Sequence, residues 1–156
     1  MKSEDKDIRK VADRLRTLCS RREYCRSEIM KKALSALDDD KEEAARVVEE
    51  LVSEKYVDDL RYASAFARDK SSIAGWGRTK IAYMLSSKGI ARETIKEALG
   101  AIDEDKAAGK LERLVECKAK SLKDDPQIRL KLLRYALGRG YAYDDVNEVV
   151  NEILKR

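Results

Sequence analysis

The sequence predicts an all-α protein, organised as three tandem three-helix repeats in an elongated, gently curved array. Apolar residues recur every three to four positions along most of the chain, a period typical of amphipathic helices. The composition, with 41% charged residues, 43% hydrophobic residues and a single Pro, favours helix over strand. Similar turn sequences also recur at a fixed interval, which indicates a repeated unit.

Nine apolar stripes predict nine short helices. They cover residues 8–18, 29–37, 47–52, 60–67, 81–85, 95–102, 111–115, 128–137 and 146–154. The breaks between the stripes contain residues suited to helix ends. Acidic residues are expected at helix N-termini, where free N–H groups favour negative charge, at positions 38–40, 58–59, 124 and 144–145. Gly89 and Gly140 are expected where helices end.

The interval between turns predicts the domain organisation. Gly89 and Gly140, each preceded by a basic residue and followed by another apolar stripe, lie 51 positions apart. We therefore predict three diverged modules, at residues 1–55, 56–102 and 103–156. A module of about 50 residues is marginally stable alone. Adjacent modules are thus expected to bury surface against each other, as in repeat arrays.

The residue types available argue against most enzyme chemistry. The chain has no His, and its three cysteines, Cys19, Cys25 and Cys117, lack C-x-x-C spacing. We predict neither a zinc site nor a disulfide framework, and we expect buried or neutral thiols. Because His is the commonest general base, its absence disfavours Ser- or Cys-based hydrolysis. We predict a non-enzymatic protein without cofactor or metal.

Hydropathy predicts the compartment. The first ten residues alternate charges and do not resemble a signal peptide. No window approaches the roughly 18 apolar residues that a membrane-spanning helix needs. We expect a cytoplasmic protein without a membrane partner, and a monomer.

The net charge of +4 is distributed unevenly. Residues 1–37 hold eleven Lys and Arg against six Asp and Glu, a balance of +5. Residues 38–55 hold three against eight, a balance of −5, and residues 56–102 hold eight against five, a balance of +3. A basic face can therefore exist on a chain of low net charge. Lys155 and Arg156, at the frayed end of the last predicted helix, are expected to be solvated.

The clearest local motif is the turn Gly75-Trp76-Gly77, which is followed by Arg78 and Lys80. Trp76 either fills the junction between helices or faces a partner beside the two cations. Cations at a helix N-terminus oppose the helix dipole, so their placement there modestly supports a binding role.

A second cluster of cations surrounds the start of the second predicted helix, and it could contact phosphates or an acidic protein surface. Its members are Arg21, Arg22, Arg26, Lys31 and Lys32. The alternative is that these are solvated helix ends. Arg134 and Arg139 form a weaker third patch. The neighbouring acids Asp58 and Asp59 are interpreted as helix caps rather than a catalytic pair.

Several segments form a recognisable series along the chain. They are residues 22–29, 56–63, 75–85 and 88–90, with looser matches at 134–137 and 139–141. In these segments and in their order the sequence resembles the RecX family of bacterial recombination regulators. The resemblance covers residues 15–154 and is most specific in the middle module. Cys25 stands where the family usually has Ser, and since Cys caps a helix poorly, we expect the start of that helix to be less fixed.

The resemblance implies three tandem three-helix repeats that lie in the groove of the RecA filament on single-stranded DNA. It further implies that the protein inhibits ATP hydrolysis, strand exchange and repressor cleavage by the filament. Arg61 and Lys88 lie in matching segments and join the candidate residues. The candidate RecA- and DNA-binding residues are thus Arg21, Arg22, Arg26, Lys31, Lys32, Arg61, Trp76, Arg78, Lys80, Lys88, Arg134 and Arg139.

Two other classes of function remain open from the residues alone. A sequence-nonspecific or helix-turn-helix-like DNA-binding protein is the first alternative, although no helix has a dense base-reading face. A helical scaffold for another protein is the second. Direct binding to bare DNA is expected to be weak and steeply dependent on salt.

Overall fold

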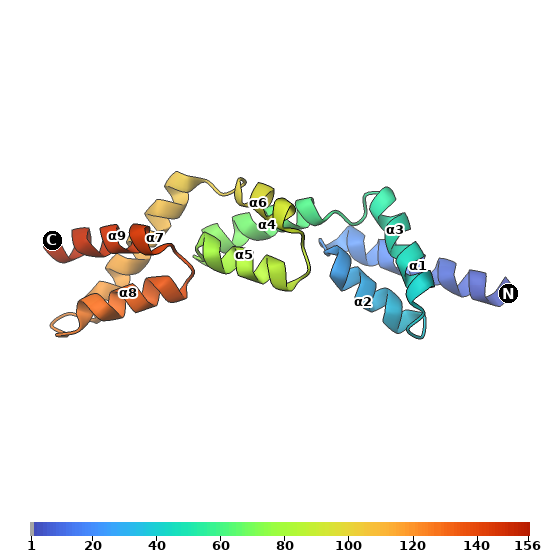
Figure 1. Ribbon diagram of the computed structural model, residues 1–156, viewed down its shortest axis with the longest axis horizontal. Helices are drawn as coiled ribbons and strands as arrows, with labels where there is room; N and C mark the ends of the chain where they lie inside the picture. The colour runs from blue at the N-terminus through green and yellow to red at the C-terminus, as the bar shows by residue number, and fades with distance from the viewer. Residues whose placement is uncertain (1) are drawn as a thin grey trace. The chain divides into compact units, whose positions relative to one another are not determined.

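The computed structural model describes residues 2–156, with side chains from residue 7 onward, so Met1 lies outside the described residues. Over this range the chain forms nine α-helices and no strand (Figure 1). In chain order they are α1 (Lys2–Arg21), α2 (Arg26–Ala36), α3 (Lys41–Ser53), α4 (Asp59–Ser72), α5 (Arg78–Ser87), α6 (Arg92–Leu99), α7 (Glu104–Ser121), α8 (Ile128–Gly138) and α9 (Tyr143–Lys155). Each predicted stripe overlaps one helix, but several helices are longer than their stripes: α7 begins seven residues before the stripe at 111–115 and ends six residues after it. The predicted all-α class is confirmed.

The chain forms two compact units. Among the described residues, unit 1 comprises residues 2–63 and Ser86–Ile95, and unit 2 comprises Ser64–Leu85 and Lys96–Arg156. Helices α4, α5 and α6 therefore contribute residues to both units. The three modules expected from the sequence stay a prediction, and each unit is described by itself below.

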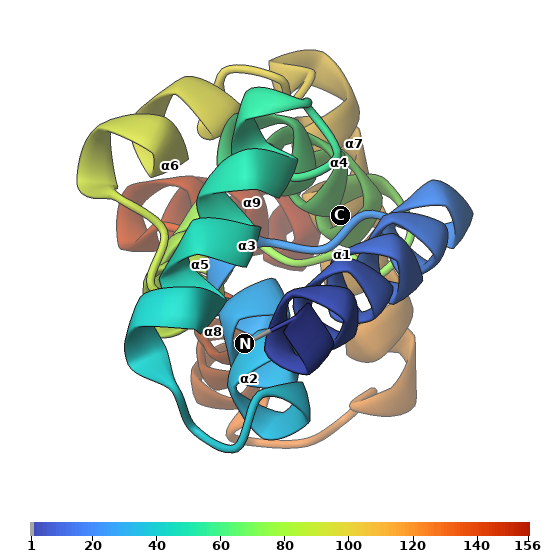
Figure 2. The same ribbon diagram turned by 90° about the vertical axis from the view of Figure 1, so that its right-hand side faces the viewer.

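Helices α1, α2 and α3 of unit 1 pack around one apolar core (Figure 2). Its buried residues are Val11, Ala12, Leu15, Ile29, Ala33, Ala44, Val47, Val48, Leu51 and Val57. The spacing of these residues along each helix is the three-to-four period seen in the sequence. Burying these stripes holds α2 in place, and with it the cations on its exposed face.

Helices α7, α8 and α9 of unit 2 pack in the same manner. Their core consists of Leu111, Val115, Leu132, Ala136, Val146, Val150 and Ile153. A short turn connects α8 to α9 and contains Gly140. The φ of Gly140 is 93°, in the left-handed region that glycine adopts at low cost. This turn carries Arg139 and Tyr141, which both matter for the sites below.

Acidic residues lie at several helix N-termini. As the sequence predicts, the carboxylates of Asp40 and Asp58 accept the backbone N–H of Glu43 and Arg61 at 3.2 and 3.0 Å. Asp59 lies in the first turn of α4, and Asp144 and Asp145 lie in the first turn of α9. Asp103, which was not in the predicted set, accepts the backbone N–H of Lys106 at 3.1 Å. Three predicted acids do not lie at helix N-termini. Asp38, Asp39 and Asp124 have positive φ values of 52°, 62° and 67° and form the turns themselves. Short polar side chains tolerate this conformation better than most.

Candidate partner interface

The start of α2 is fixed by two carboxylates. Glu28 accepts the backbone N–H of Cys25 at 3.0 Å, and Asp59 of α4 accepts the backbone N–H of Arg26 at 2.7 Å. Cys25 itself is fully buried. These two carboxylates hold the N–H groups of Cys25 and Arg26, whereas an N-cap side chain would accept the N–H of Ser27 or Glu28. The expectation of a less fixed helix start therefore stays a prediction.

The same region of unit 1 contacts the turn after α5. Ser27 Oγ donates a hydrogen bond to the carbonyl oxygen of Lys88 at 2.5 Å. The Lys88 ammonium lies 3.7 Å from the Glu28 carboxylate and 5.8 Å from the centre of the Tyr62 ring. We call this set of contacts, including Asp59, the unit 1 junction. It ties Lys88, a candidate binding residue, into the fold.

Neighbouring groups in the unit 1 junction lower the pKa of Glu28. Burial acts to raise the pKa of Glu28, but hydrogen bonds from Cys25 and the nearby charges of Lys88 and Arg22 outweigh burial and lower it. The ionised carboxylate is therefore the form that holds the start of α2.

Arg61 is engaged within the chain. Its Nε donates to both oxygens of Glu23, at 2.8 and 2.9 Å, and its terminal nitrogens donate to the carbonyls of Lys55 and Tyr56 at 3.0 and 3.2 Å. A guanidinium has five N–H donors in a rigid fork, and here they bridge the α1–α2 connection and the α3–α4 connection. These contacts support a structural role for Arg61.

The remaining cations of the second cluster lie on the surface of unit 1. Arg22 and Lys32 both lie over the Tyr24 ring, at 4.1 and 5.6 Å from its centre, so the structure brings them together. Arg26 pairs with Glu49. Arg21 and Lys31 are exposed, and neither forms an ion pair with a residue whose side chain is described. Exposed cations on α2 and in the segment just before it are suited to contact a phosphate or a carboxylate of a partner.

In unit 2 the turn before α5 meets the α8–α9 turn through backbone atoms. The N–H of Gly77 donates to the carbonyl of Arg139 at 2.8 Å, and the N–H of Thr79 donates to the carbonyl of Gly140 at 3.1 Å. A Cβ on Gly77 would lie under 3.0 Å from the Gly140 backbone, and one on Gly140 would lie as close to Lys80. We call this set of contacts the unit 2 junction.

The Arg139 side chain completes the unit 2 junction. Its guanidinium donates to the carbonyls of Ala74 and Gly75, the second bond through Nε at 3.2 Å. It also lies 5.7 Å from the centre of the Tyr135 ring. Arg139 is thus half-buried and holds the turn that precedes Trp76, whereas Arg134 is exposed on α8.

Trp76 packs against side chains of its own unit. The ammonium groups of Lys70 and Lys80 lie over its ring at 4.7 and 4.4 Å from the centre, and Phe66 meets it edge-on at 6.2 Å. Arg78 pairs with Glu104 at 3.6 Å and keeps 45% of its side chain exposed. These contacts favour Trp76 as the filler of a helix junction, with Lys70, Lys80 and Arg78 forming a basic rim around it.

Two further expectations concern cysteines and the last residues. All three cysteines are free; Cys25 is buried, Cys19 is half-buried and Cys117 is exposed. Burial raises the pKa of the Cys19 and Cys25 thiols, which keeps both neutral. Arg156, expected to be solvated, instead pairs with Glu112 at 2.7 Å and Glu116 at 3.9 Å. Within residues 7–156, no group of three acidic, Cys or His side chains could hold a metal ion.

Residues that sequence reasoning missed include Ser27, Asp59 as a cap for a distant helix, and Lys70. The capping-box spacing from Cys25 to Glu28 could have predicted the hydrogen bond between these two residues at the start of α2. No sequence signal gives the contacts of Ser27 or Asp59, because their partners lie 61 and 33 residues away. No helix among residues 2–156 has the length and apolar character needed to cross a membrane.

Comparison with known proteins identifies the family. Models of the second and third three-helix domains of RecX match residues 58–99 and 105–150. The Regulatory protein RecX of Clostridium tetani is 34% identical over 113 residues, 70% of this chain and 51% of that protein. The protein of the same name from Salmonella arizonae is 32% identical over 116 residues, 74% of this chain and 68% of that protein.

The fold is similar to that of a solved structure as well. The crystal structure of RecX from Lactobacillus salivarius matches with a TM-score of 0.84 and 22% identity, over 97% of this chain and 99% of that one. The chain spans about half the length of the clostridial relatives it matches. The relatives are named regulatory proteins, which agrees with the prediction of a non-enzymatic chain. The chain therefore belongs to the RecX family of regulatory proteins.

Proposed function

We propose that this chain regulates the RecA filament on single-stranded DNA by restraining its ATP hydrolysis, strand exchange and repressor cleavage. Membership of the RecX family carries this proposal. We also propose that the chain acts as a monomer in the cytoplasm and needs no cofactor. Its role is to bind the filament and resist the rearrangement that turnover requires.

Exposed cations support contact with such a filament. In unit 1, Arg21 and Lys31 lie on the surface without an ion pair from the described side chains, and Arg22 and Lys32 share the Tyr24 ring. In unit 2, Arg78 is exposed and pairs with Glu104, and the half-buried Lys80 lies on the Trp76 ring. Each cation that meets a phosphate or carboxylate at the interface forms a charge-assisted hydrogen bond, which contributes about 1.5–3 kcal/mol.

The decisive experiment compares two charge-reversal variants in an ATPase assay with RecA and single-stranded DNA. Lys31→Glu with Lys32→Glu removes two exposed cations of α2, whereas Arg92→Glu with Lys96→Glu removes two exposed cations of α6. Net charge changes identically in both, so bulk attraction is held equal. We expect the α2 variant to raise the half-inhibitory concentration about tenfold or more, and the α6 variant to raise it far less.

Equal half-inhibitory concentrations for the two folded variants would remove α2 from the interface. No inhibition by the unmodified chain at saturating concentration would refute the proposed function itself. Circular dichroism must show the same helical content in each variant, because a loss of fold would imitate a loss of contact.

The turn in unit 2 provides a second test. Arg78→Glu with Lys80→Glu is expected to weaken inhibition through the basic rim of Trp76. Lys155 and Arg156 are unsuitable as its control because Arg156 pairs with Glu112. Arg92→Glu with Lys96→Glu serves as the control instead. Equal changes in the half-inhibitory concentration for the two variants would exclude the basic rim of Trp76 from the interface.

Binding to bare DNA separates this proposal from its main alternative. Because the candidate cations are dispersed and several are paired within the chain, we expect weak binding to DNA that falls steeply with salt and ignores sequence. Fluorescence anisotropy with labelled oligonucleotides measures this. Tight, sequence-selective binding at physiological salt would favour a helix-turn-helix-like DNA-binding protein.

A further inference from the structure

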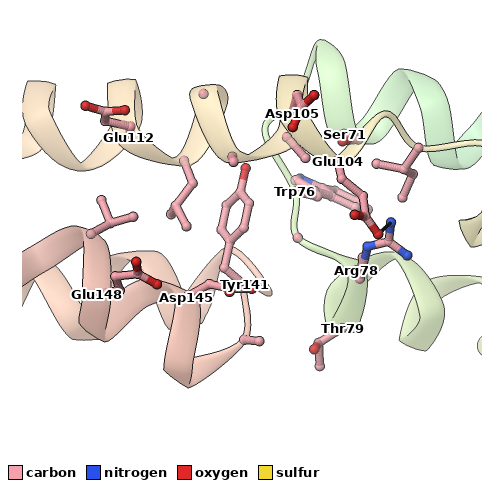
Figure 3. A pocket seen from close by; sticks show the side chains of 18 of the residues that line it. Ser71, Trp76, Arg78, Thr79, Glu104, Asp105, Glu112, Tyr141, Asp145 and Glu148 are labelled. Atoms are coloured by element: carbon pink, nitrogen blue, oxygen red, sulfur yellow. Dashed lines mark ion pairs between the residues drawn. The ribbon is translucent and has the colours of Figure 1, made fainter.

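An acidic cleft of about 800 Å³ lies in unit 2, between α7, α9 and the turn before α5 (Figure 3). The residues that line it include six carboxylates and a single guanidinium, that of Arg78. The carboxylates belong to Glu104, Asp105, Glu112, Asp145, Glu148 and Glu152. This concentration of negative charge stands out on a chain with a net charge of +4.

The fold neutralises only part of this charge. Arg78 pairs with Glu104 and Arg156 pairs with Glu112. Glu148 and Glu152 lie one turn apart on α9, and neither forms an ion pair within 4.0 Å among residues 7–156, although the charge of Arg156 acts on Glu152 from a longer distance. Like charges at this spacing destabilise a helix by a few tenths of a kcal/mol. This pair of carboxylates therefore does not stabilise the free protein.

A polar group without a partner lies in the same cleft. The hydroxyl oxygen of Tyr141 is buried and has no hydrogen-bond partner in the described structure. Figure 3 shows its ring extending from the α8–α9 turn towards α7, among the lining side chains. Burial raises the pKa of Tyr141, so the hydroxyl keeps its proton and can donate. A buried hydroxyl without a partner is unfavourable, and a ligand that displaces the side chains covering it can supply an acceptor.

The cleft wall also has apolar area, from Trp76, Leu111 and Val149 among others. A ligand that matches all three features carries positive charge, apolar side chains and a hydrogen-bond acceptor. Nucleic acid does not match, because its phosphates would meet the unpaired carboxylates.

We propose that this cleft binds a cationic, amphipathic segment of a partner protein. Lysine or arginine side chains of the segment pair with Glu148 and Glu152, its apolar side chains cover Leu111 and Val149, and a backbone carbonyl accepts from the Tyr141 hydroxyl. The inference goes beyond the proposed function, because it assigns a protein contact to a surface that phosphates avoid. It does not require the partner to be RecA.

A binding experiment with the full chain tests the charge requirement. The probe is a short amphipathic helical peptide with lysines on one face and leucines on the other, and its analogue carries glutamate at each lysine position. Glu148→Gln with Glu152→Gln removes the cleft pair, and Glu93→Gln with Glu97→Gln removes an exposed acidic pair of the same spacing on α6.

We expect the lysine peptide to bind and the glutamate peptide not to bind. The cleft variant should weaken binding about fivefold or more, while the α6 variant changes it less than about twofold. Equal effects of the two variants, or equal binding of the two peptides, would overturn the proposal. Failure of this test leaves the ATPase experiment with α2 unaffected, so the two hypotheses fail separately.

Tyr141→Phe distinguishes a binding role from a structural one. Because the hydroxyl has no partner in the free chain, its removal should leave the thermal unfolding midpoint unchanged or higher. Binding of the lysine peptide should weaken about threefold to tenfold, the value of one lost hydrogen bond. An unchanged affinity for the peptide would exclude the hydroxyl from the site, and a lower midpoint would assign it to the fold.

Discussion

The two helix junctions form equivalent contacts with different atoms. In unit 1, the Ser27 side chain donates to the carbonyl of Lys88. In unit 2, the backbone N–H of Gly77 donates to the carbonyl of Arg139, which lies 51 positions after Lys88. The repeated turn therefore receives a side-chain hydrogen bond in one unit and a backbone hydrogen bond in the other.

This difference follows from how closely the segments approach. A Cβ on Gly89 would lie 3.8 Å from Ser27 Cβ, which is ordinary contact, whereas a Cβ on Gly140 would overlap Lys80. The backbone hydrogen bonds of the unit 2 junction bring Gly77 and Gly140 so close to the facing segment that a Cβ on either would overlap it. The unit 1 junction leaves room for side chains and is therefore sensitive to changes in Ser27, Asp59 and Glu28.

The largest expected effect comes from adding a methyl group to the unit 2 junction. Gly140→Ala should cost on the order of 3 kcal/mol or more, since it combines a positive φ with an overlap. Gly89→Ala has a similar φ of 78° but no overlap, and should cost about 1 kcal/mol. Urea unfolding, with hydrogen exchange to assign the loss to each unit, measures both.

Gly138→Ala is the control for this comparison. A Cβ at Gly138 meets nothing within 4 Å, so the substitution should be neutral or stabilise α8 by up to about 1 kcal/mol. Similar losses for Gly89→Ala and Gly140→Ala would show that packing does not distinguish the junctions.

An intermediate effect is expected in the unit 1 junction. Asp59→Ala removes the acceptor for the N–H of Arg26 and should destabilise the start of α2 by about 1–2 kcal/mol. Asp59→Asn keeps an acceptor oxygen and should restore part of this loss. Hydrogen exchange of the first amides of α2 gives the readout. Unchanged exchange in Asp59→Ala would assign the cap to Glu28 alone.

The smallest effect concerns pH. The folded-state pKa of Glu28 is lowered, so its stabilising contribution is present above the unfolded-state value and is lost as the pH falls through the folded-state pKa. Glu28→Gln should cost less than about 1 kcal/mol near neutral pH, and the difference from the wild type should shrink in acid. The comparison is the unfolding free energy of both proteins across this pH range.

Glu93→Gln is the matched control for the pH series, because Glu93 is exposed and forms no hydrogen bond or ion pair among the described side chains. For each variant, the difference in unfolding free energy from the wild type is followed over pH. If this difference changes with pH equally for Glu28→Gln and Glu93→Gln, the contacts of Glu28 contribute nothing to the pH dependence of stability.

The sequence by itself determined the helices, the family and the glycine turns. Helix position follows from local periodicity, since apolar residues such as Ile29 and Ala33 need one face to be buried whatever covers it. The caps at Asp40 and Asp58 are equally local, because a side chain reaches an N–H two or three residues away. Residue type at these positions was sufficient.

Only the tertiary structure decided which charged groups are available and which are engaged within the chain. Arg61, Lys88 and Arg139 are as basic as Arg21 and Lys31 in the sequence, yet carbonyls or carboxylates of distant segments engage the first three. The acidic cleft likewise combines residues of α7 with residues of α9. Such contacts depend on how helices pack, and a one-dimensional charge pattern does not specify which distant backbone atoms will come within hydrogen-bond distance.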